Sequence, residues 1–365
     1  MDYMAQTLAL ARLALGQASP NPAVGAVVVR AGRIVGQGYT QPPGGDHAEV
    51  VALKQAGELA RGASLYVSLE PCCHHGRTPP CTGAIIKSGI TEVHAATLDD
   101  NPLVAGGGRQ ALEAAGIRVS IGEGEAEARV LNEAYFKFIC MGIPFVTAKY
   151  AMSLDGKIAT RSGDSKWISS EPSRQYVHNM RYVSDAVMVG VNTVISDDPH
   201  LTARTGCGRG GPAHRQPLRV IVDDKGRMPP GARLFKEPGK TLIALGSKPA
   251  PPVREALTRA GAELVELPTS SGLVDIAGLL NYLGQRQVTS VLVEGGGTLL
   301  GSLFDQGLVD KVIAFVAPIV IGGKAARTPV AGLGVERIAA ALKLERLEVN
   351  RLQDDVMISA YVSKA

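Results

Sequence analysis

Hydrophobic and polar positions in the first part of the chain follow two periods. Apolar residues at Met4, Leu8, Ala11 and Leu15 recur at three- to four-residue spacing and predict an amphipathic first helix. Two β-rich runs on either side of the turn Ala31–Gly32 predict a hairpin. The same patterns predict further strands at residues 64–69, 92–97 and 118–121, and helices at residues 47–55, 81–88, 109–115 and 125–141.

Helix-stopping residues at Gly142–Pro144 interrupt this pattern, so we expect a first domain of residues 1–144 and a second of residues 145–365. The second part alternates again, which predicts a mostly parallel sheet covered on both faces. Its strands are expected at residues 145–152, 186–189, 218–222, 241–245, 263–266 and 291–293, and its helices at residues 172–182, 253–260, 274–283 and 298–306. The tail predicts an antiparallel edge from strands at residues 311–316, 342–347 and 355–362. A surface loop is expected at residues 205–217.

Composition narrows the class of protein. The 365 residues carry a formal net charge of +4, which suits an anionic small substrate and is too small for a nucleic-acid coat. No run of about 18 apolar residues predicts a membrane span. Five cysteines, three of them at Cys72, Cys73 and Cys81, argue against a secreted disulfide framework. They favour a metal or reactive site in a reducing cytoplasm.

The most specific chemical motif is His47-Ala48-Glu49 followed by Pro71-Cys72 and then Cys81. One imidazole and two thiolates are suitable Zn²⁺ ligands that leave a fourth position for water, whose pKa zinc lowers to about 7. Glu49, two residues after the histidine, is placed to transfer protons rather than to bind metal. This is the pattern of zinc-dependent nucleobase deaminases. A closed structural zinc site and a pair of redox thiols remain alternatives, and Cys73 is expected to be a packed thiol.

The spacing of the cysteines departs from the common deaminase signature, which has two intervening residues. Here eight residues separate them, Cys-His-His-Gly-Arg-Thr-Pro-Pro. Together with Asn21-Pro22-Ala23-Val24-Gly25 and residues 99–106, this segment resembles the deaminase half of the bifunctional riboflavin-biosynthesis deaminase/reductase family. The resemblance implies that the pyrimidine or its ribose phosphate is surrounded by Asn21, His74, Arg77 and Asn101. Turn roles before Pro22 and Pro102 remain alternatives for the two asparagines.

The second half contains a buried strand that runs through glycines into a helix, Val291-Leu292-Val293-Glu294-Gly295-Gly296-Gly297-Thr298-Leu299. Such a junction lets backbone N–H groups approach a phosphate, although the spacing is not that of a Rossmann fingerprint and a turn without ligand is an alternative. Residues 149–157, 165–168, 191–199 and 201–204 resemble the reductase half of the same family. This resemblance implies a dihydrofolate-reductase-like fold that binds NADPH.

Residue by residue, the resemblance implies two sets of contacts in the second half. The residues expected to line the cofactor are Ala151, Trp167, Thr193, Asp197, Asp224, Gly296, Gly297, Thr298, Leu299, Leu300, Gly301 and Ser302. Those expected to hold the substrate are Ser165, Arg181, Leu201, Arg204 and Glu294. Trp167 has a core position as its alternative, and Asp224 suits ribose hydroxyls better than a phosphate. Lys149 and Asp197 are both candidates to assist proton transfer.

The patterns predict a cytoplasmic α/β enzyme, and the resemblance implies a cytidine-deaminase-like α/β/α domain followed by a dihydrofolate-reductase-like domain. By the resemblance, the first domain deaminates 2,5-diamino-6-(5-phosphoribosylamino)pyrimidin-4-one with zinc. The second uses NADPH to reduce the ribosyl chain of 5-amino-6-(5-phosphoribosylamino)uracil to ribityl. A nucleic-acid base deaminase that docks RNA is disfavoured, because aromatics are 4% and charges are interspersed. A structural zinc module fused to a working reductase is a further alternative, and a homo-oligomer is left open.

Overall fold

The computed structural model describes residues 2–76, 78–204 and 215–363. The chain divides into two compact units, Met1–Ile143 and Pro144–Ala365, so the division falls one residue before the end expected for the first domain. Each unit has its own sheet and its own core.

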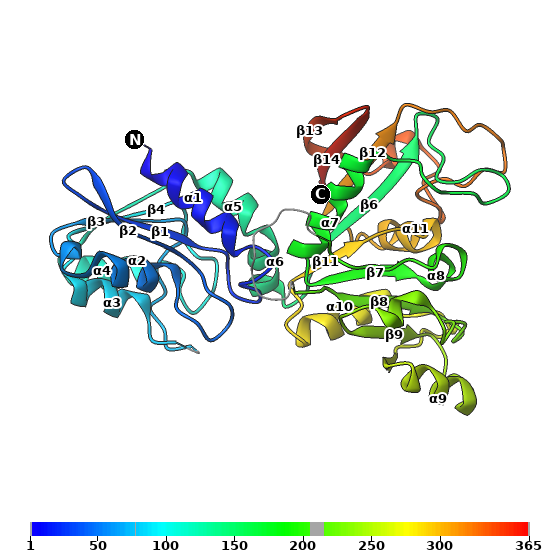
Figure 1. Ribbon diagram of the computed structural model, residues 1–365, viewed down its shortest axis with the longest axis horizontal. Helices are drawn as coiled ribbons and strands as arrows, with labels where there is room; N and C mark the ends of the chain where they lie inside the picture. The colour runs from blue at the N-terminus through cyan, green and yellow to red at the C-terminus, as the bar shows by residue number, and fades with distance from the viewer. Residues whose placement is uncertain (1, 77, 205–214, 364–365) are drawn as a thin grey trace. The chain divides into compact units, whose positions relative to one another are not determined.

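The sheet of unit 1 has five strands in the order β2-β1-β3-β4-β5 (Figure 1). The expected hairpin is present, since β1 pairs antiparallel with β2 and then with β3, whereas β3, β4 and β5 are parallel. Parallel strands end at the same edge of the sheet, so the residues that follow β3 and β4 lie at one edge. The strands are β1 (Gly25–Arg30), β2 (Arg33–Tyr39), β3 (Ser64–Val67), β4 (Glu92–Ala95) and β5 (Arg118–Ile121).

Helices cover both faces of this sheet (Figure 1). On one face α1 packs beside α5, and the expected apolar stripe of α1 is buried at Met4, Leu8 and Ala11. On the other face α2, α3 and α4 follow one another over the larger core. The helices are α1 (Tyr3–Ala14), α2 (Ala48–Ala56), α3 (Cys81–Ser88), α4 (Gly107–Ala114), α5 (Glu125–Leu131) and α6 (Glu133–Met141), with a 3-10 turn η1 (Gly57–Ala60).

The prediction of a single helix over residues 125–141 is wrong, because the helix is interrupted at Asn132 and forms two helices, α5 and α6. The buried Asn132 side chain accepts a hydrogen bond from Ala23 N–H at 2.8 Å and donates one to Ala23 C=O at 3.0 Å. A side-chain amide that pairs with another segment in this way competes with helical hydrogen bonding. The break therefore holds the Asn21–Ala23 segment, which carries a candidate site residue.

The sheet of unit 2 has nine strands in the order β10-β9-β8-β7-β11-β6-β12-β14-β13. All neighbours from β10 to β12 are parallel, as the alternating pattern predicts. The strands are β6 (Phe145–Ser153), β7 (Ala186–Gly190), β8 (Leu218–Asp223), β9 (Thr241–Leu245), β10 (Ala262–Glu266), β11 (Ser290–Val293), β12 (Lys311–Ala317), β13 (Leu344–Leu352) and β14 (Asp355–Val362).

Two cores lie against opposite faces of this sheet. The apolar side chains of α10 and α11 pack on one face, and those of α7, α8 and α9 pack on the other. The helix α8 comes directly after β7 and has no counterpart among the predicted elements. The helices are α7 (Glu171–Val183), α8 (Val191–Asp197), α9 (Pro251–Arg259), α10 (Ile276–Gln285) and α11 (Gly297–Asp305), with 3-10 turns η2 (Arg233–Lys236) and η3 (Ile338–Ala340).

The expected antiparallel edge is confirmed, since β14 pairs antiparallel with both β12 and β13. The strand β13 begins two residues later than predicted and extends to Leu352. Most of the loop expected at residues 205–217 lies outside the described residues. No helix in the described ranges combines the length and apolar character needed to cross a bilayer.

Candidate metal centre and cofactor site

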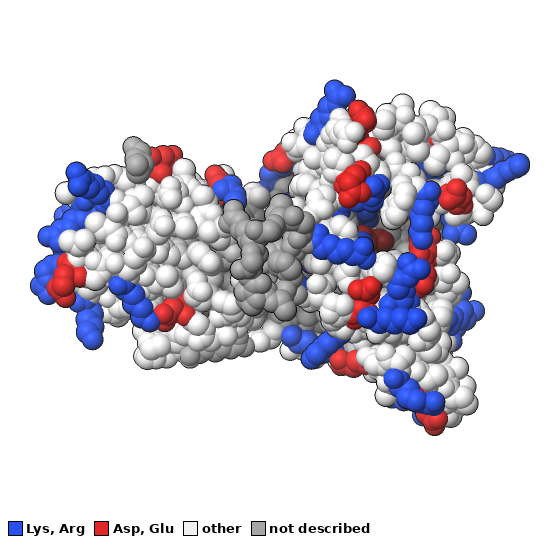
Figure 2. All heavy atoms as spheres, viewed as in Figure 1, with Lys and Arg blue, Asp and Glu red and all other residues white. Residues whose placement is uncertain are grey.

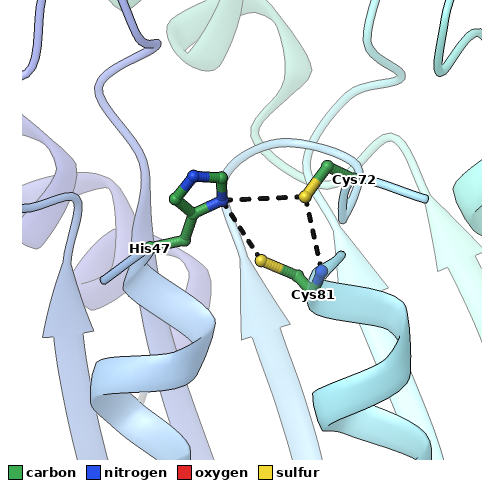
Figure 3. Close-up of side chains that lie close together, drawn as sticks. All are labelled: His47, Cys72 and Cys81. Carbon is green, nitrogen blue, oxygen red and sulfur yellow. Dashed lines mark hydrogen bonds between the residues drawn. The ribbon is translucent and has the colours of Figure 1, made fainter. Parts of the chain in front are cut away.

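Three local structures bring the metal-binding motif together in unit 1 (Figure 3). His47 is the N-cap residue of α2, Cys72 lies beyond the end of β3, and Cys81 is the first residue of α3. Both helices begin at the same edge of the sheet, so residues 25 and 34 positions apart along the chain converge there. Among the residues that the structure describes, this is the one group of three or more His, Cys, Asp or Glu side chains whose ligand atoms lie close enough together to hold a metal ion.

The distances from His47 Nδ1 to the two sulfurs fit a tetrahedral zinc ion. His47 Nδ1 lies 3.6 Å from Cys72 Sγ and 3.3 Å from Cys81 Sγ. Ideal zinc bond lengths place nitrogen and sulfur ligands about 3.6 Å apart. One imidazole and two sulfurs leave a fourth position open, as in catalytic zinc sites. The donor set therefore fits Zn²⁺.

The electrostatics of the two sulfurs agree with this. The hydrogen bond between Cys81 and Cys72 lowers the pKa of the Cys72 thiol to about 4, helped by His47 and opposed by burial. The same bond, together with burial, raises the pKa of Cys81. The pair thus holds one thiolate ready, and metal binding displaces the proton of the other.

Glu49 lies in the first turn of α2, beside the three donors. Its side chain is only 4% exposed, and burial, followed by the charge of Cys72, raises its pKa to about 7. It lies beside Cys81 and is not a member of the cluster of metal-binding donors. A carboxyl group in such surroundings is suited to accept and return a proton near neutral pH.

The residues expected to contact the pyrimidine differ in whether their polar atoms are already hydrogen-bonded within the protein. His74 Nδ1 is buried and has no hydrogen-bond partner among the described residues. Asn101 is buried, and its side-chain oxygen accepts the Leu103 N–H at 3.0 Å, so that oxygen makes a turn. Asn21 lies in the segment that Asn132 holds. Arg77 lies outside the described residues.

Glu70 is an organising residue that the sequence patterns did not single out. Its buried carboxylate accepts three backbone N–H groups, from Asp99 at 3.2 Å, Gly106 at 3.0 Å and Arg109 at 2.9 Å. It thereby caps the N-terminus of α4 from another segment and fixes the loop that carries Asn101. Its position next to Pro71-Cys72 is the only signal that the sequence offers.

In unit 2 the chain reverses its course at the centre of the sheet. From β6 it runs outward through β7, β8, β9 and β10, and then returns to β11, which lies between β7 and β6. Ligands of open α/β sheets bind at such a switch point, beyond the carboxyl ends of the strands. Here β7 leads into α8 and β11 leads into α11, so two helix N-termini lie at this switch point.

The glycines between β11 and α11 have distinct roles. Gly295 and Gly296 adopt φ values of 96° and 85°, which other residues rarely adopt. A Cβ on Gly296 would lie 3.5 Å from Thr193 Oγ1, so this turn lies next to the start of α8. A Cβ on Gly297 or Gly301 would instead meet backbone oxygens of the chain's own segment 328–331. These two glycines admit that segment against α11.

Some of the other expected cofactor residues already contact other protein groups, and some do not. Trp167 is 72% exposed, with the Arg174 guanidinium 4.7 Å from its ring centroid, so it is not a core residue. Asp224 accepts the Val274 N–H at 2.8 Å, which engages one carboxylate oxygen in a loop contact. Ala151 lies half-buried on β6, while Thr298, Leu299, Leu300 and Ser302 lie on α11.

Each expected substrate residue of unit 2 is already in contact with other parts of the fold, and two of them, Arg181 and Glu294, pair with each other. Arg181 donates to both Glu294 oxygens and also to Thr202 C=O. Lys149 Nζ lies 3.9 Å from Glu294, and burial lowers the pKa of this lysine despite that carboxylate. The remaining residues are Ser165, which donates to Asp197 at 3.1 Å, Leu201, whose side chain is in the core, and Arg204, whose Nε donates to Thr202 Oγ1.

These features define a two-domain enzyme that joins a zinc-type deaminase to a reductase: the two sheets, the His/Cys/Cys cluster with its buried glutamate, and the glycine turn at the switch point of the second sheet. The family model for the cytidine and deoxycytidylate deaminase zinc-binding region matches residues 1–97, and that for the RibD C-terminal domain matches residues 144–358. The chain belongs to the RibD family of bifunctional riboflavin-biosynthesis deaminase/reductases.

Relatives and solved structures match over both halves. The riboflavin biosynthesis protein RibD of Aquifex aeolicus is 43% identical over 98% of this chain and 97% of its own length, and that of Escherichia coli is 40% identical over 98% and 97%. A structure of Acinetobacter baumannii RibD superposes with a TM-score of 0.89 at 38% identity, covering 99% of this chain and 98% of that one. A Thermotoga maritima diaminohydroxyphosphoribosylaminopyrimidine deaminase/5-amino-6-(5-phosphoribosylamino)uracil reductase superposes with a TM-score of 0.85 at 36% identity, with the same coverage.

Proposed function

We propose that this bifunctional enzyme deaminates 2,5-diamino-6-(5-phosphoribosylamino)pyrimidin-4-one in a domain of residues 1–144. The domain of residues 145–365 then reduces the ribosyl chain of 5-amino-6-(5-phosphoribosylamino)uracil to ribityl with NADPH. The Thermotoga maritima relative, whose name states both activities, supports these substrates by its likeness over both halves of the chain. The metal cluster with its buried glutamate is the observation that carries the first half of the proposal.

In the deaminase site each residue has one task. His47, Cys72 and Cys81 hold the zinc ion, which when bound lowers the pKa of a coordinated water to about 7. Glu49 takes a proton from the attacking water and delivers one to the departing amine, because its carboxyl is buried beside the donors. The products of the reaction are the uracil and ammonia.

His74 supplies the best-supported substrate contact. A buried imidazole nitrogen without a hydrogen-bond partner costs free energy. His74 Nδ1 is therefore suited to form a hydrogen bond with a polar atom of the substrate. Asn101 uses its oxygen in a turn and its NH₂ group also contacts the Tyr135 hydroxyl, so we assign only the remaining N–H of that group to the substrate. We assign Asn21 and Arg77 to the same substrate, Arg77 by its fit to a phosphate.

In the reductase site we assign the turn at Gly295–Gly296 and the residue Thr193 to the NADPH phosphates. Both lie at helix N-termini beside the switch point of the sheet, where backbone N–H groups favour an anion. The rest of the α11 segment, together with Ala151, Trp167, Asp197 and Asp224, completes the proposed cofactor surface. Bound NADPH supplies the hydride, and the chain orients it.

The charged cluster of Arg181, Glu294 and Lys149 is proposed to face the reacting end of the substrate. Arg181 and Glu294 are largely shielded from solvent and paired bidentately, so their geometry is fixed before substrate binds. Lys149 is favoured over Asp197 for assisting proton transfer, because burial lowers its pKa and so eases release of its proton. Ser165, Leu201 and Arg204 remain proposed substrate contacts.

A phosphorylated small molecule suits the surface better than nucleic acid does. On the face shown in Figure 2, the described lysines and arginines are interleaved with aspartates and glutamates rather than gathered in one continuous stripe. We also propose a cytoplasmic location, since Cys72, Cys73 and Cys81 are free thiols and a reducing compartment keeps thiols available for metal.

We propose that the chain forms a homo-oligomer through the edge of the unit 2 sheet. The strand β13 is the last in the strand order, and two apolar side chains on it, Leu347 and Val349, are 61% and 59% exposed. Uncovered edges of this kind pair readily with a second copy. Sedimentation of wild type and Leu347→Glu tests this: dissociation of an assembly in the variant supports it, and a monomeric wild type refutes it.

Purified protein that was never exposed to chelators tests the enzymatic proposal. Elemental analysis is expected to find zinc near one ion per chain, and a coupled assay is expected to show ammonia release followed by NADPH oxidation. Ammonia release from metal-free protein would refute the assigned deaminase site. NADPH oxidation that does not require the aminouracil would refute the assigned second step.

A further inference from the structure

The segment between the two cysteines reaches back to the metal histidine. Thr78 Oγ1 lies 3.1 Å from His47 Nε2, on the opposite side of the imidazole from the two sulfurs. His47 Nδ1 faces those sulfurs at 3.6 and 3.3 Å. The ring is therefore held between a sulfur pair on one nitrogen and a hydroxyl on the other.

This arrangement selects one tautomer of the histidine. A nitrogen that binds a metal must present a lone pair, so Nδ1 must be free of its proton and Nε2 must carry one. Nε2–H then donates to Thr78 Oγ1, which accepts. In metal sites such a hydrogen bond fixes the ring orientation and increases the basicity of the ligand.

The chain holds Thr78 in place by local means. Pro79 and Pro80 follow it, which restricts its backbone to extended conformations, and Pro80 is the N-cap residue of α3. The Gly76 N–H donates to Thr78 C=O at 3.3 Å, which ties Thr78 to the segment before it. Thr78 is thus tied through two rigid residues to Cys81, which is itself one of the donors.

We propose that Thr78 is a positioning residue of the deaminase, which orients His47 and selects the tautomer that binds zinc. The inference rests on the proposed zinc site and deepens it. It also gives the long spacing between Cys72 and Cys81 a task, because a two-residue spacing has no room for a residue that returns to the histidine. The common deaminase signature has that short spacing.

The test compares zinc binding by the full chain and three variants. Thr78→Val keeps the shape and removes the acceptor, whereas Thr78→Ser keeps the hydroxyl. Thr91→Val is the matched control, since its hydroxyl bonds to Ala63 C=O at the start of β4, at the opposite end of the strand from the metal donors. Each apoprotein is titrated with zinc against a chromophoric chelator, and NADPH oxidation on the aminouracil reports whether unit 2 is intact.

Thr78→Val is expected to weaken zinc affinity about 10- to 100-fold. Thr78→Ser and Thr91→Val are expected to bind zinc as wild type does. Equal zinc affinity in Thr78→Val and wild type would overturn the inference. Wild type that binds no zinc would instead refute the proposed function, so the two failures are distinguishable.

A measurement on unmodified protein covers the case in which Thr78→Val does not fold. Nitrogen-15 NMR of the imidazoles in the zinc-loaded chain is expected to show His47 protonated on Nε2 and its Nε2–H exchanging slowly. A proton on Nδ1 would overturn the proposal. So would a His47 Nε2–H that exchanges as fast as that of an exposed histidine such as His75.

Discussion

Replacing Glu70 with Gln tests how firmly the Asn101 loop must be held. The Glu70 carboxylate accepts one backbone N–H on Oε1, from Arg109, and two on Oε2, from Asp99 and Gly106. A Gln side chain of the same shape has one oxygen, which will face the two-bond side. Its NH₂ group then faces the Arg109 N–H, so one buried charge-assisted hydrogen bond is lost.

Loss of one hydrogen bond to a charged group costs about 1.5–3 kcal/mol. The loop and the first turn of α4 should therefore open roughly 10- to 100-fold more often. Hydrogen exchange followed by mass spectrometry on peptides spanning residues 99–109 measures this directly. The deaminase KM should rise with loop opening, while zinc content and reductase rates stay at wild-type values.

Glu113→Gln is the control, because Glu113 lies on the same helix and pairs with Arg109 at the surface. Surface pairs contribute about 0–1 kcal/mol, so this variant should exchange as wild type does. Unchanged protection of residues 99–109 in Glu70→Gln would refute the capping role. Raised exchange throughout unit 1 would show a loss of global stability instead of local opening.

Three further predictions address the other features of the molecule. Glu49→Gln should lower the deaminase kcat about 100- to 10,000-fold and leave bound zinc and NADPH oxidation unchanged; parallel loss of both activities would contradict separate sites. Asp155 has its pKa lowered to about 2 by a hydrogen bond from Ser153 and by two backbone amides of the loop after β12. A lowered carboxyl pKa stabilises the fold above the ordinary value near 3.8 and ceases to do so as the pH falls to about 2. Asp155→Asn should therefore reduce stability in urea at pH 7 but not at pH 2, and an equal loss at both would refute this. Gly301→Ala places a Cβ 2.2 Å from a backbone oxygen and should destabilise unit 2 by about 1–3 kcal/mol, measured by Trp167 fluorescence, whereas Gly231→Ala, which meets no atom within 4 Å, should not.

The sequence alone determined the features that depend on short stretches of chain. The periodicity predicted the hairpin, the parallel strands and the antiparallel edge, because side-chain burial follows the period of each element. The metal donors were also predictable, since His47 and Cys81 lie at helix starts and Cys72 follows a strand. Residue chemistry restricts what such a trio can bind.

The tertiary structure decided how segments far apart in the chain use each other's polar groups. Asn132 breaks a periodic helical pattern because its amide pairs with the backbone of Ala23, 109 residues away. Arg181, expected to hold the substrate, is engaged by Glu294 across 113 residues, and Glu70 caps a helix that begins far downstream. Such hydrogen bonds depend on where the fold places a donor and an acceptor, and local sequence patterns do not predict those positions.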